Sequence, residues 1–176
     1  MKLNTNKNKK IIPSTTEINL LFKKLFKINR SLTGNGNVET LKILNEIIPL
    51  KIKSLKSGSK VYDWKIPSEW SINDAFIINS KGKKILDWKK NNLHVVNYSE
   101  PIKKKNVSKK ELLKHIHTLP SNKKWIPYRT SYYDKKWGFC ATQALIESSD
   151  FSEPFEICID SDFRKNGKLV FAEAFH

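Results

Sequence analysis

The chain of 176 residues has few cysteines, few arginines and no long apolar run. Its two cysteines, Cys140 and Cys158, are too few for a disulfide framework, so we interpret them as free thiols, with a single disulfide left open. No apolar stretch approaches the roughly 18 residues of a membrane-spanning helix. The Lys- and Asn-rich N-terminus has no apolar segment like that of a secretory signal. We therefore expect a cytoplasmic protein with no membrane partner.

The net charge of +16 is carried almost entirely by lysine, because only 3 of the 33 basic residues are arginine. A strongly basic chain is typical of nucleic-acid binding. Arginine, however, supplies the bidentate contacts to phosphate and guanine that specific binders use. The excess is also uneven, since residues 134–176 are net acidic. The composition therefore disfavours nucleic acid as a partner, although a basic nucleic-acid-binding domain stays as an alternative.

Two helices are predicted near the N-terminus, after a disordered segment at 1–13. Ser14 and Glu17 form a capping-box pattern. Apolar residues then follow at helical spacing up to a predicted end near Asn29: Ile18, Leu21, Phe22, Leu25 and Phe26. A second helix is predicted over 38–48, stopped by Pro49. Together they predict a helical hairpin at 14–49.

From residue 50 the pattern changes to short strands, predicted at 51–55, 61–64, 75–78, 84–88, 93–98, 137–141, 155–160 and 168–175. The strands at 75–78 and 84–88 flank a turn and predict a hairpin. One helix interrupts the strands, with Ser108 as its cap and Pro120 as its limit. The predicted fold class is α+β, a helical hairpin followed by a mostly antiparallel β domain at 50–176. Because the strand pattern runs to the last residues, we expect a truncated part of a longer protein.

The histidines do not form a recognisable metal pattern. His115 and His117 lie on the predicted helix two residues apart, so they would face different sides. Neither has a cysteine or carboxylate at zinc-ligand spacing. His94 is placed on a predicted strand, as a half-buried, hydrogen-bonded side chain, and His176 ends the chain. No metal ligand is predicted in this sequence.

Three other patterns leave a functional and a structural interpretation open. Cys140 is either a nucleophile or, as we favour, a small buried strand residue. The glycines at 34 and 36 open a helix without the lysine of a phosphate loop, and favour a helix–helix turn. Asp160 and Asp162 end a predicted strand on one side of it, as a cation site or a solvated turn.

The segment 125–139 is rich in aromatic side chains and also contains Arg129. Tyrosine and tryptophan bury apolar area while keeping a polar group, which suits a ligand surface. A loop packed on its own sheet would have the same composition. Both interpretations stay open at this point.

Several segments together resemble a known family over about residues 18–175: 30–36 with 39–41, 63–70 with 74–75, 91–99, 117–120, 126–133 and 137–140. The chain is similar to the bacterial and archaeal aminopeptidase-like zinc proteins, formerly domains of unknown function. The resemblance implies an α/β aminopeptidase core, to which the hairpin at 14–49 would belong. It implies that 50–176 is a β-rich domain inserted in that core, and that a winged helix follows.

The resemblance also implies a zinc-dependent hydrolase of peptide or amide bonds, in which the metal activates water and a glutamate acts as general base. The family's zinc residues belong to Cys-His-Pro-Ser and Asn-Leu-Ser-Gly stretches, and this sequence has neither. Zinc is therefore expected for the full-length family member and not for this chain. No catalytic or metal residue is assigned, and whether the chain is part of an enzyme stays open.

If the inserted domain walls the active-site cleft, the substrate-binding candidates are Arg129, Tyr132, Tyr133 and Trp137. The expected substrate is a small peptide-like or amide compound. A non-catalytic module that binds peptide or sugar through the loop 125–139 is the alternative. A homo-oligomer is also left open.

Overall fold

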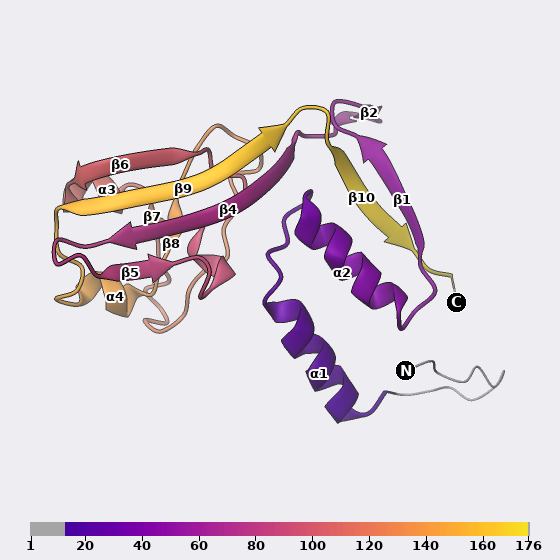
Figure 1. Ribbon diagram of the computed structural model, residues 1–176, viewed down its shortest axis with the longest axis horizontal. Helices are drawn as coiled ribbons and strands as arrows, with labels where there is room; N and C mark the ends of the chain where they lie inside the picture. The colour runs from indigo at the N-terminus through magenta and orange to yellow at the C-terminus, as the bar shows by residue number, and fades with distance from the viewer. Residues whose placement is uncertain (1–12, 176) are drawn as a thin grey trace.

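The computed structural model describes residues 13–175, and all but the last residue of the predicted disordered segment 1–13 lies outside them. The described residues form two lobes (Figure 1). One lobe contains two helices and a two-stranded ribbon, and we call it the helix–ribbon lobe. The other contains a four-stranded antiparallel sheet with short helices behind it, and we call it the sheet lobe. The predicted α+β class, two helices followed by mostly antiparallel sheets, is confirmed.

The first helix, α1 (Thr15–Phe26), begins at the predicted capping box. The Ser14 hydroxyl accepts a hydrogen bond from the backbone N–H of Glu17 at 3.2 Å, and the Glu17 carboxylate accepts one from the backbone N–H of Ser14 at 2.8 Å. The second helix, α2 (Asn35–Asn45), begins three residues before the predicted start. The reason is Gly34, which takes the N-cap position with φ of 99° and leaves the next residue free to start the helix.

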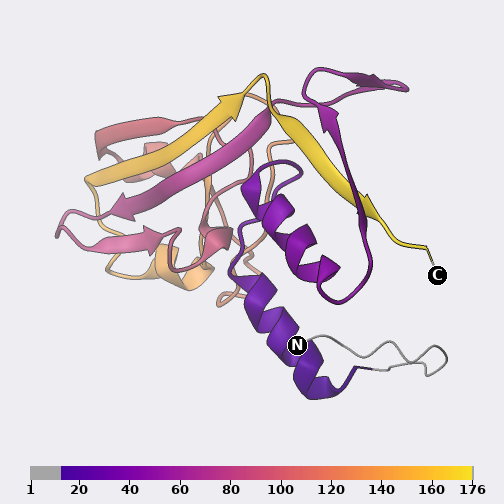
Figure 2. The ribbon, with the colours of Figure 1, turned by 45° about the vertical axis from the view of Figure 1, so that its right-hand side comes forward.

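A ribbon of β1 (Lys51–Lys56) and β10 (Lys168–Glu173) packs beside α2. Leu169 and Val170 of β10 are buried, and the Asn37 side-chain amide donates to the backbone oxygen of Val170 at 2.8 Å. A small hairpin, β2 (Lys60–Val61) with β3 (Trp64–Lys65), follows β1. The domain boundary after residue 49 stays a prediction. In space, β1 and β10 lie with α2 rather than with the four-stranded sheet (Figures 1 and 2).

The main sheet has the order β5 (Lys84–Asp87), β4 (Glu69–Ile78), β9 (Phe155–Arg164), β6 (Ile102–Val107), with all neighbours antiparallel. The predicted hairpin of 75–78 and 84–88 is confirmed as β4–β5. The prediction that Asp160 and Asp162 end a strand is wrong, because β9 continues to Arg164 through its pairing with β4. Both aspartates are exposed on one side of β9, with buried Ser161 between them.

Short elements cover one face of this sheet and close the core: α3 (Lys109–Leu113), β7 (Ile116–His117), β8 (Phe139–Cys140) and α4 (Gln143–Glu147). The core side chains come from the sheet and from these elements: Ala75, Ile77, Leu86, Val95, Val107, Leu112, Phe139, Ala141, Phe151, Phe155, Ile157 and Ile159. The sequence reading missed α4, which begins at the Thr142 cap. This lobe therefore has two short helices instead of one.

Two further predictions about this lobe are wrong. The helix expected up to Pro120 ends at Leu113, because His115 and His117 accept backbone hydrogen bonds from Phe139 and Ala141 across the parallel pair β7–β8. The strand expected at 93–98 begins instead as the 3-10 turn η1 (Asn92–His94), capped by the Asn91 side chain. Asparagine side chains compete with strand ladders in this way.

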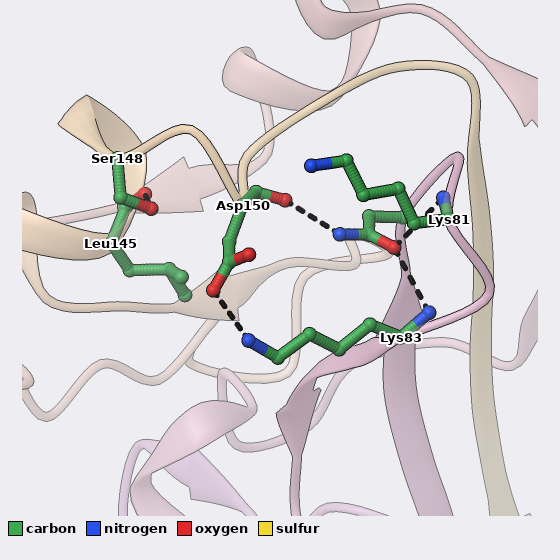
Figure 3. Close-up of polar contacts among 6 residues, drawn as sticks. Lys81, Lys83, Leu145, Ser148 and Asp150 are labelled. Atoms are coloured by element: carbon green, nitrogen blue, oxygen red, sulfur yellow. Dashed lines mark hydrogen bonds and ion pairs between the residues drawn. The ribbon is translucent and has the colours of Figure 1, made fainter.

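The tip of the β4–β5 hairpin is fastened to the loop after α4 (Figure 3). Asn79 is 4% exposed, and its side-chain oxygen accepts from the backbone N–H groups of Lys81 and Lys83. Its amide donates to the backbone oxygen of Asp150 at 2.9 Å. The Lys83 ammonium lies 2.6 Å from the Asp150 carboxylate, which lowers the pKa of that carboxyl. One buried side chain therefore fixes both the turn and its contact with α4.

Candidate functional site

Segments singled out by the family resemblance converge in a buried polar cluster between the two lobes, which we call the junction: Thr33, Trp70, Tyr98 and Ser99. The Thr33 hydroxyl lies 2.7 Å from the Tyr98 hydroxyl and accepts from the backbone N–H of Trp70 at 3.0 Å. The rings of Trp70 and Tyr98 stack with centroids 5.7 Å apart. The segment before α2 is therefore bonded directly to the first residues of β4 and to the chain after η1.

Ser99 extends the junction into the sheet lobe. Its backbone oxygen accepts from the Trp70 indole at 3.0 Å and from the Ser161 hydroxyl of β9 at 2.8 Å. Its hydroxyl donates to the backbone oxygen of Val96 and accepts from the N–H of Gly138. These groups are buried and paired, as buried polar groups must be to avoid a free-energy cost. The residue types at the junction are thus explained by structure.

Gly34 is required by the same contact. A Cβ atom at this position would lie 2.5 Å from the backbone oxygen of Trp70, and the φ of 99° is one that side chains rarely adopt. The glycines at 34 and 36 therefore serve close packing at the start of α2, as the helix–helix turn interpretation expected. They do not build a phosphate loop.

The aromatic loop 125–139 is held against the residues that precede and follow Tyr98. Asn97 donates its backbone N–H to Arg129 at 3.0 Å and accepts one from Ser131 at 3.0 Å. Between these anchors and Lys136, Tyr132 and Tyr133 adopt left-handed conformations with φ of 51° and 73°. Such conformations cost free energy for bulky residues and persist only where surrounding contacts impose them. The loop is thus built to aim two neighbouring tyrosines in fixed directions.

Tyr133 turns its ring edge toward Tyr98, with centroids 5.0 Å apart, and burial raises the pKa of its hydroxyl. Tyr132 points away and is 75% exposed. Tyr133 forms one wall of a groove of about 380 Å³ whose other lining residues are Pro67, Ser68, Tyr98, Glu100, Asp134, Lys135, Phe163 and Lys165. This groove has apolar walls and a rim with charges of both signs, a combination typical of ligand pockets.

The other two predicted substrate residues do not join this groove. Trp137 is half-buried, stacks on His115 with centroids 3.7 Å apart, and packs against the core. Arg129 is exposed. Burial, and after it the positive charge of Arg129, lowers the pKa of His117. The structure thus divides the four candidates between the Tyr133 groove and the β7–β8 side of the lobe. Their role in substrate binding stays a prediction.

Cys140 has the environment of a structural residue. It is fully buried in β8, and burial raises the pKa of its thiol to about 12. Its backbone oxygen lies 2.8 Å from Nδ1 of His94, and burial lowers the pKa of that imidazole. A thiol that stays protonated at neutral pH is a poor nucleophile. The interpretation of Cys140 as a small buried strand residue is confirmed, and both cysteines are free.

A second concave surface, missed by the sequence reading, lies between the lobes. This inter-lobe cleft has a volume of about 650 Å³ and is lined by the end of α1, the start of α2, and strands β4 and β9. Asp162 and Arg164 of β9 face it across from Lys24 and Glu39. The missed signal was the position of the first two family motifs, since both line this cleft. Within residues 13–175, no group of three or more His, Cys, Asp or Glu side chains could hold a metal ion.

Comparison with known protein families gives a match over residues 69–162 to a domain of unknown function, DUF2172. The chain belongs to the DUF2172 family. The match begins with β4 and ends within β9, so this DUF2172 domain corresponds to the sheet lobe with its aromatic loop. No helix among the described residues of the DUF2172 chain is long and apolar enough to cross a membrane.

A curated relative is 46% identical over 159 residues, and bears the name "Putative polysaccharide biosynthesis protein with aminopeptidase-like domain" from Clostridium acetobutylicum. A crystal structure described as a "putative peptidase" from the same organism is 47% identical, with a TM-score of 0.82 over 89% of this chain. The DUF2172 chain spans 36% of the length of each. The predicted relationship to aminopeptidase-like proteins is thereby confirmed.

Proposed function

We propose that this DUF2172 chain is the substrate-facing, non-catalytic part of a zinc-dependent aminopeptidase-like hydrolase of peptide or amide bonds. The observation that carries the proposal is the 46% identity to part of a protein whose name records an aminopeptidase-like domain. The described residues offer no donor set for zinc. We therefore assign zinc chemistry to the aminopeptidase-like domain and derive no catalytic step in this chain.

The Tyr133 groove supports a role in substrate recognition. Its walls include Pro67, Tyr133 and Phe163, which suit an apolar side chain. Glu100 and Asp134 line the same groove and suit a protonated amino group. A peptide with a free amino terminus and an apolar first side chain presents both features together. Tyr132, beside the groove and 75% exposed, offers a further contact for a longer substrate.

The test uses the complete Clostridium acetobutylicum relative, with changes at the positions that align with Tyr132 and Tyr133. Replacing both by alanine is expected to raise KM for an aminoacyl amide with a leucine or phenylalanine side chain at least tenfold, with a smaller effect on kcat. Phenylalanine at both positions keeps the ring contacts and is the matched control. Unchanged kinetics in the alanine variant would refute the proposed role of the loop.

A sugar is the second candidate ligand, because the same relative's name records polysaccharide biosynthesis and the loop exposes Trp125, Tyr128 and Tyr132 by 63%, 60% and 75%. Exposed aromatic rings with polar edges suit a saccharide surface as well as a peptide. Titration of this chain with oligosaccharides, followed by tryptophan fluorescence, separates the two candidates. Saturable quenching by a saccharide that is lost in Trp125→Ala would favour the sugar-binding module over the peptide role.

A further inference from the structure

We propose that one face of α1 is a docking surface for an aminopeptidase-like domain, an inference that rests on the proposed function and names the partner it requires. We call this surface the α1 face and define it by Ile18, Phe22 and Phe26. The three residues follow one another at intervals of four, so they lie in one row along the helix. Their exposed fractions are 39%, 67% and 67%.

The α1 face is half of a wider apolar stripe. Leu21 and Leu25 form the other half and are half-buried, whereas no residue of α1 is fully buried. A full amphipathic stripe normally packs against a core along its whole width. Burying a phenylalanine side chain contributes roughly 1.5–3 kcal/mol. Two phenylalanines in one row therefore leave a substantial part of the helix's packing energy unused.

Few polar contacts hold α1 in place. Among the described residues, Lys24 pairs with Glu46 at 3.5 Å, with both side chains exposed, and the Asn92 amide donates to the backbone oxygen of Phe26 at 3.1 Å. A helix of 12 residues is marginal in water without tertiary packing. Figures 1 and 2 both show α1 extending beyond α2 and away from the sheet. Its stability therefore calls for a packing partner outside the described residues.

Other exposed apolar side chains of the helix–ribbon lobe have the same character. Ile47, Ile48 and Ile52 are 50%, 46% and 43% exposed, and Phe175 is 89% exposed. In the sheet lobe, by contrast, the exposed large side chains are mostly tyrosine and tryptophan, which tolerate water at their polar edges. Aliphatic side chains have no such edge. This difference marks the helix–ribbon lobe as the covered side of the molecule.

A hollow at the end of α1 adds shape to the surface. It has a volume of about 500 Å³ and lies between the last turn of α1 and the segment after β5, with Phe26 and Trp88 among its lining residues. A side chain of a docking domain can enter it next to the α1 face. Lys23 and Lys24 occupy the last turn of α1, and Lys27 follows as its C-cap, so the matching surface is expected to carry acidic residues at its edge.

The occupant is argued from the length of the relative. This chain spans 36% of that protein, whose remaining length has no counterpart here and whose name records an aminopeptidase-like domain. The solved structure superimposes on 89% of this chain with a TM-score of 0.82, so the same fold occurs within a chain almost three times as long. An aminopeptidase-like domain is therefore the partner that the α1 face fits.

The experiment co-expresses this tagged chain with the part of the Clostridium acetobutylicum relative that lies outside the match, and measures co-purification and affinity. The key variant is Phe22→Asp. Its matched control is Leu20→Asp, because Leu20 is 60% exposed on the opposite side of the same helix and receives the same charge. We expect a one-to-one complex that Phe22→Asp weakens at least tenfold and that Leu20→Asp leaves within twofold of the parent.

Hydrogen exchange gives the second readout, and α1 amides are expected to become protected only in the complex. The same two changes in the complete relative test the surface if the separate segment does not fold. There, the change aligned with Phe22 should lower Tm by several degrees more than the control. Equal effects of both variants, or a dimer of this chain alone with α1 already protected, would overturn the proposal. A complex without hydrolase activity would refute the proposed function and leave the docking surface intact.

Discussion

Removal of the Tyr98 hydroxyl should loosen the junction between the lobes. The Thr33 hydroxyl accepts from the Trp70 N–H and lies 2.7 Å from the Tyr98 hydroxyl, with Thr33 and Tyr98 2% and 1% exposed. In Tyr98→Phe, Thr33 loses one partner and water does not replace it. A stranded buried group costs roughly 1–3 kcal/mol. We expect the free energy of unfolding to fall by about 2 kcal/mol, which for a chain of this size lowers Tm by roughly 4–8 °C.

Thr33→Val should cost more, because it strands both the Trp70 N–H and the Tyr98 hydroxyl. We expect a loss of about 4 kcal/mol on the same basis of roughly 1–3 kcal/mol for each stranded group. Thr33→Ser keeps the hydroxyl and loses only a methyl group, about 1 kcal/mol. In the double variant Thr33→Val/Tyr98→Phe no tyrosine hydroxyl is left to be stranded, so the loss should fall short of the sum by about 1–2 kcal/mol.

Urea unfolding followed by tryptophan fluorescence measures all four variants, since Trp70 is 2% exposed in the native state. Tyr62→Phe, at a position 94% exposed, is the control and should leave stability unchanged. Equal losses in Thr33→Val and Thr33→Ser, or strictly additive single changes in the double variant, would refute the hydrogen-bonded junction.

Three further predictions follow from buried groups. Asn79→Ala removes three hydrogen bonds of a buried side chain, so it should lower the free energy of unfolding by about 3 kcal/mol in a urea titration, whereas Ser80→Ala at the exposed neighbouring position should cost under about 0.5 kcal/mol. A thiol reagent at pH 8 should modify Cys158 before Cys140, because Cys140 is fully buried and burial raises its pKa to about 12; mass spectrometry of partly labelled protein would contradict this if Cys140 reacted first. Burial raises the pKa of Tyr98 to about 12 against an ordinary value of 10.0, so the unfolded chain ionises first and the stability from this group, full below pH 10, falls between pH 10 and 12. Tyr98→Phe should show a shallower fall over that range, and an unchanged slope would argue against it.

Local patterns in the sequence predicted the elements that local chemistry determines. Ser14 and Glu17 defined the start of α1, and the turn before Lys84 defined the β4–β5 hairpin. Predictions failed where distant partners decide. His115 follows the end of a helix because its backbone oxygen bonds Phe139, and Gly34 caps α2 in close contact with Trp70. Neither contact leaves a mark in the neighbouring residues.

The candidate site shows the same limit. Composition singled out the aromatic loop, and the left-handed backbone at Tyr132 and Tyr133 bears out its unusual character. Composition could not separate the side chains that line a groove from those that pack inward. Trp137 stacks on His115, which is 22 residues away in sequence, and only the fold brings them together. The inter-lobe cleft was missed for this reason, since four separate elements line it.

The ribbon has a consequence for the order in which the chain folds. Its register pairs Lys56 with Lys168, and the Ser57 N–H donates to the oxygen of Gly167 at 2.9 Å, so the whole of residues 57–167 forms one closed loop between the two strands. Closing a long flexible loop costs entropy, and contacts between residues distant in sequence form slowly. Once the sheet lobe has formed, β4 and β9 hold the two ends of that loop close together. We therefore expect the ribbon to zip up late, with α2 settling onto β10 as the last step.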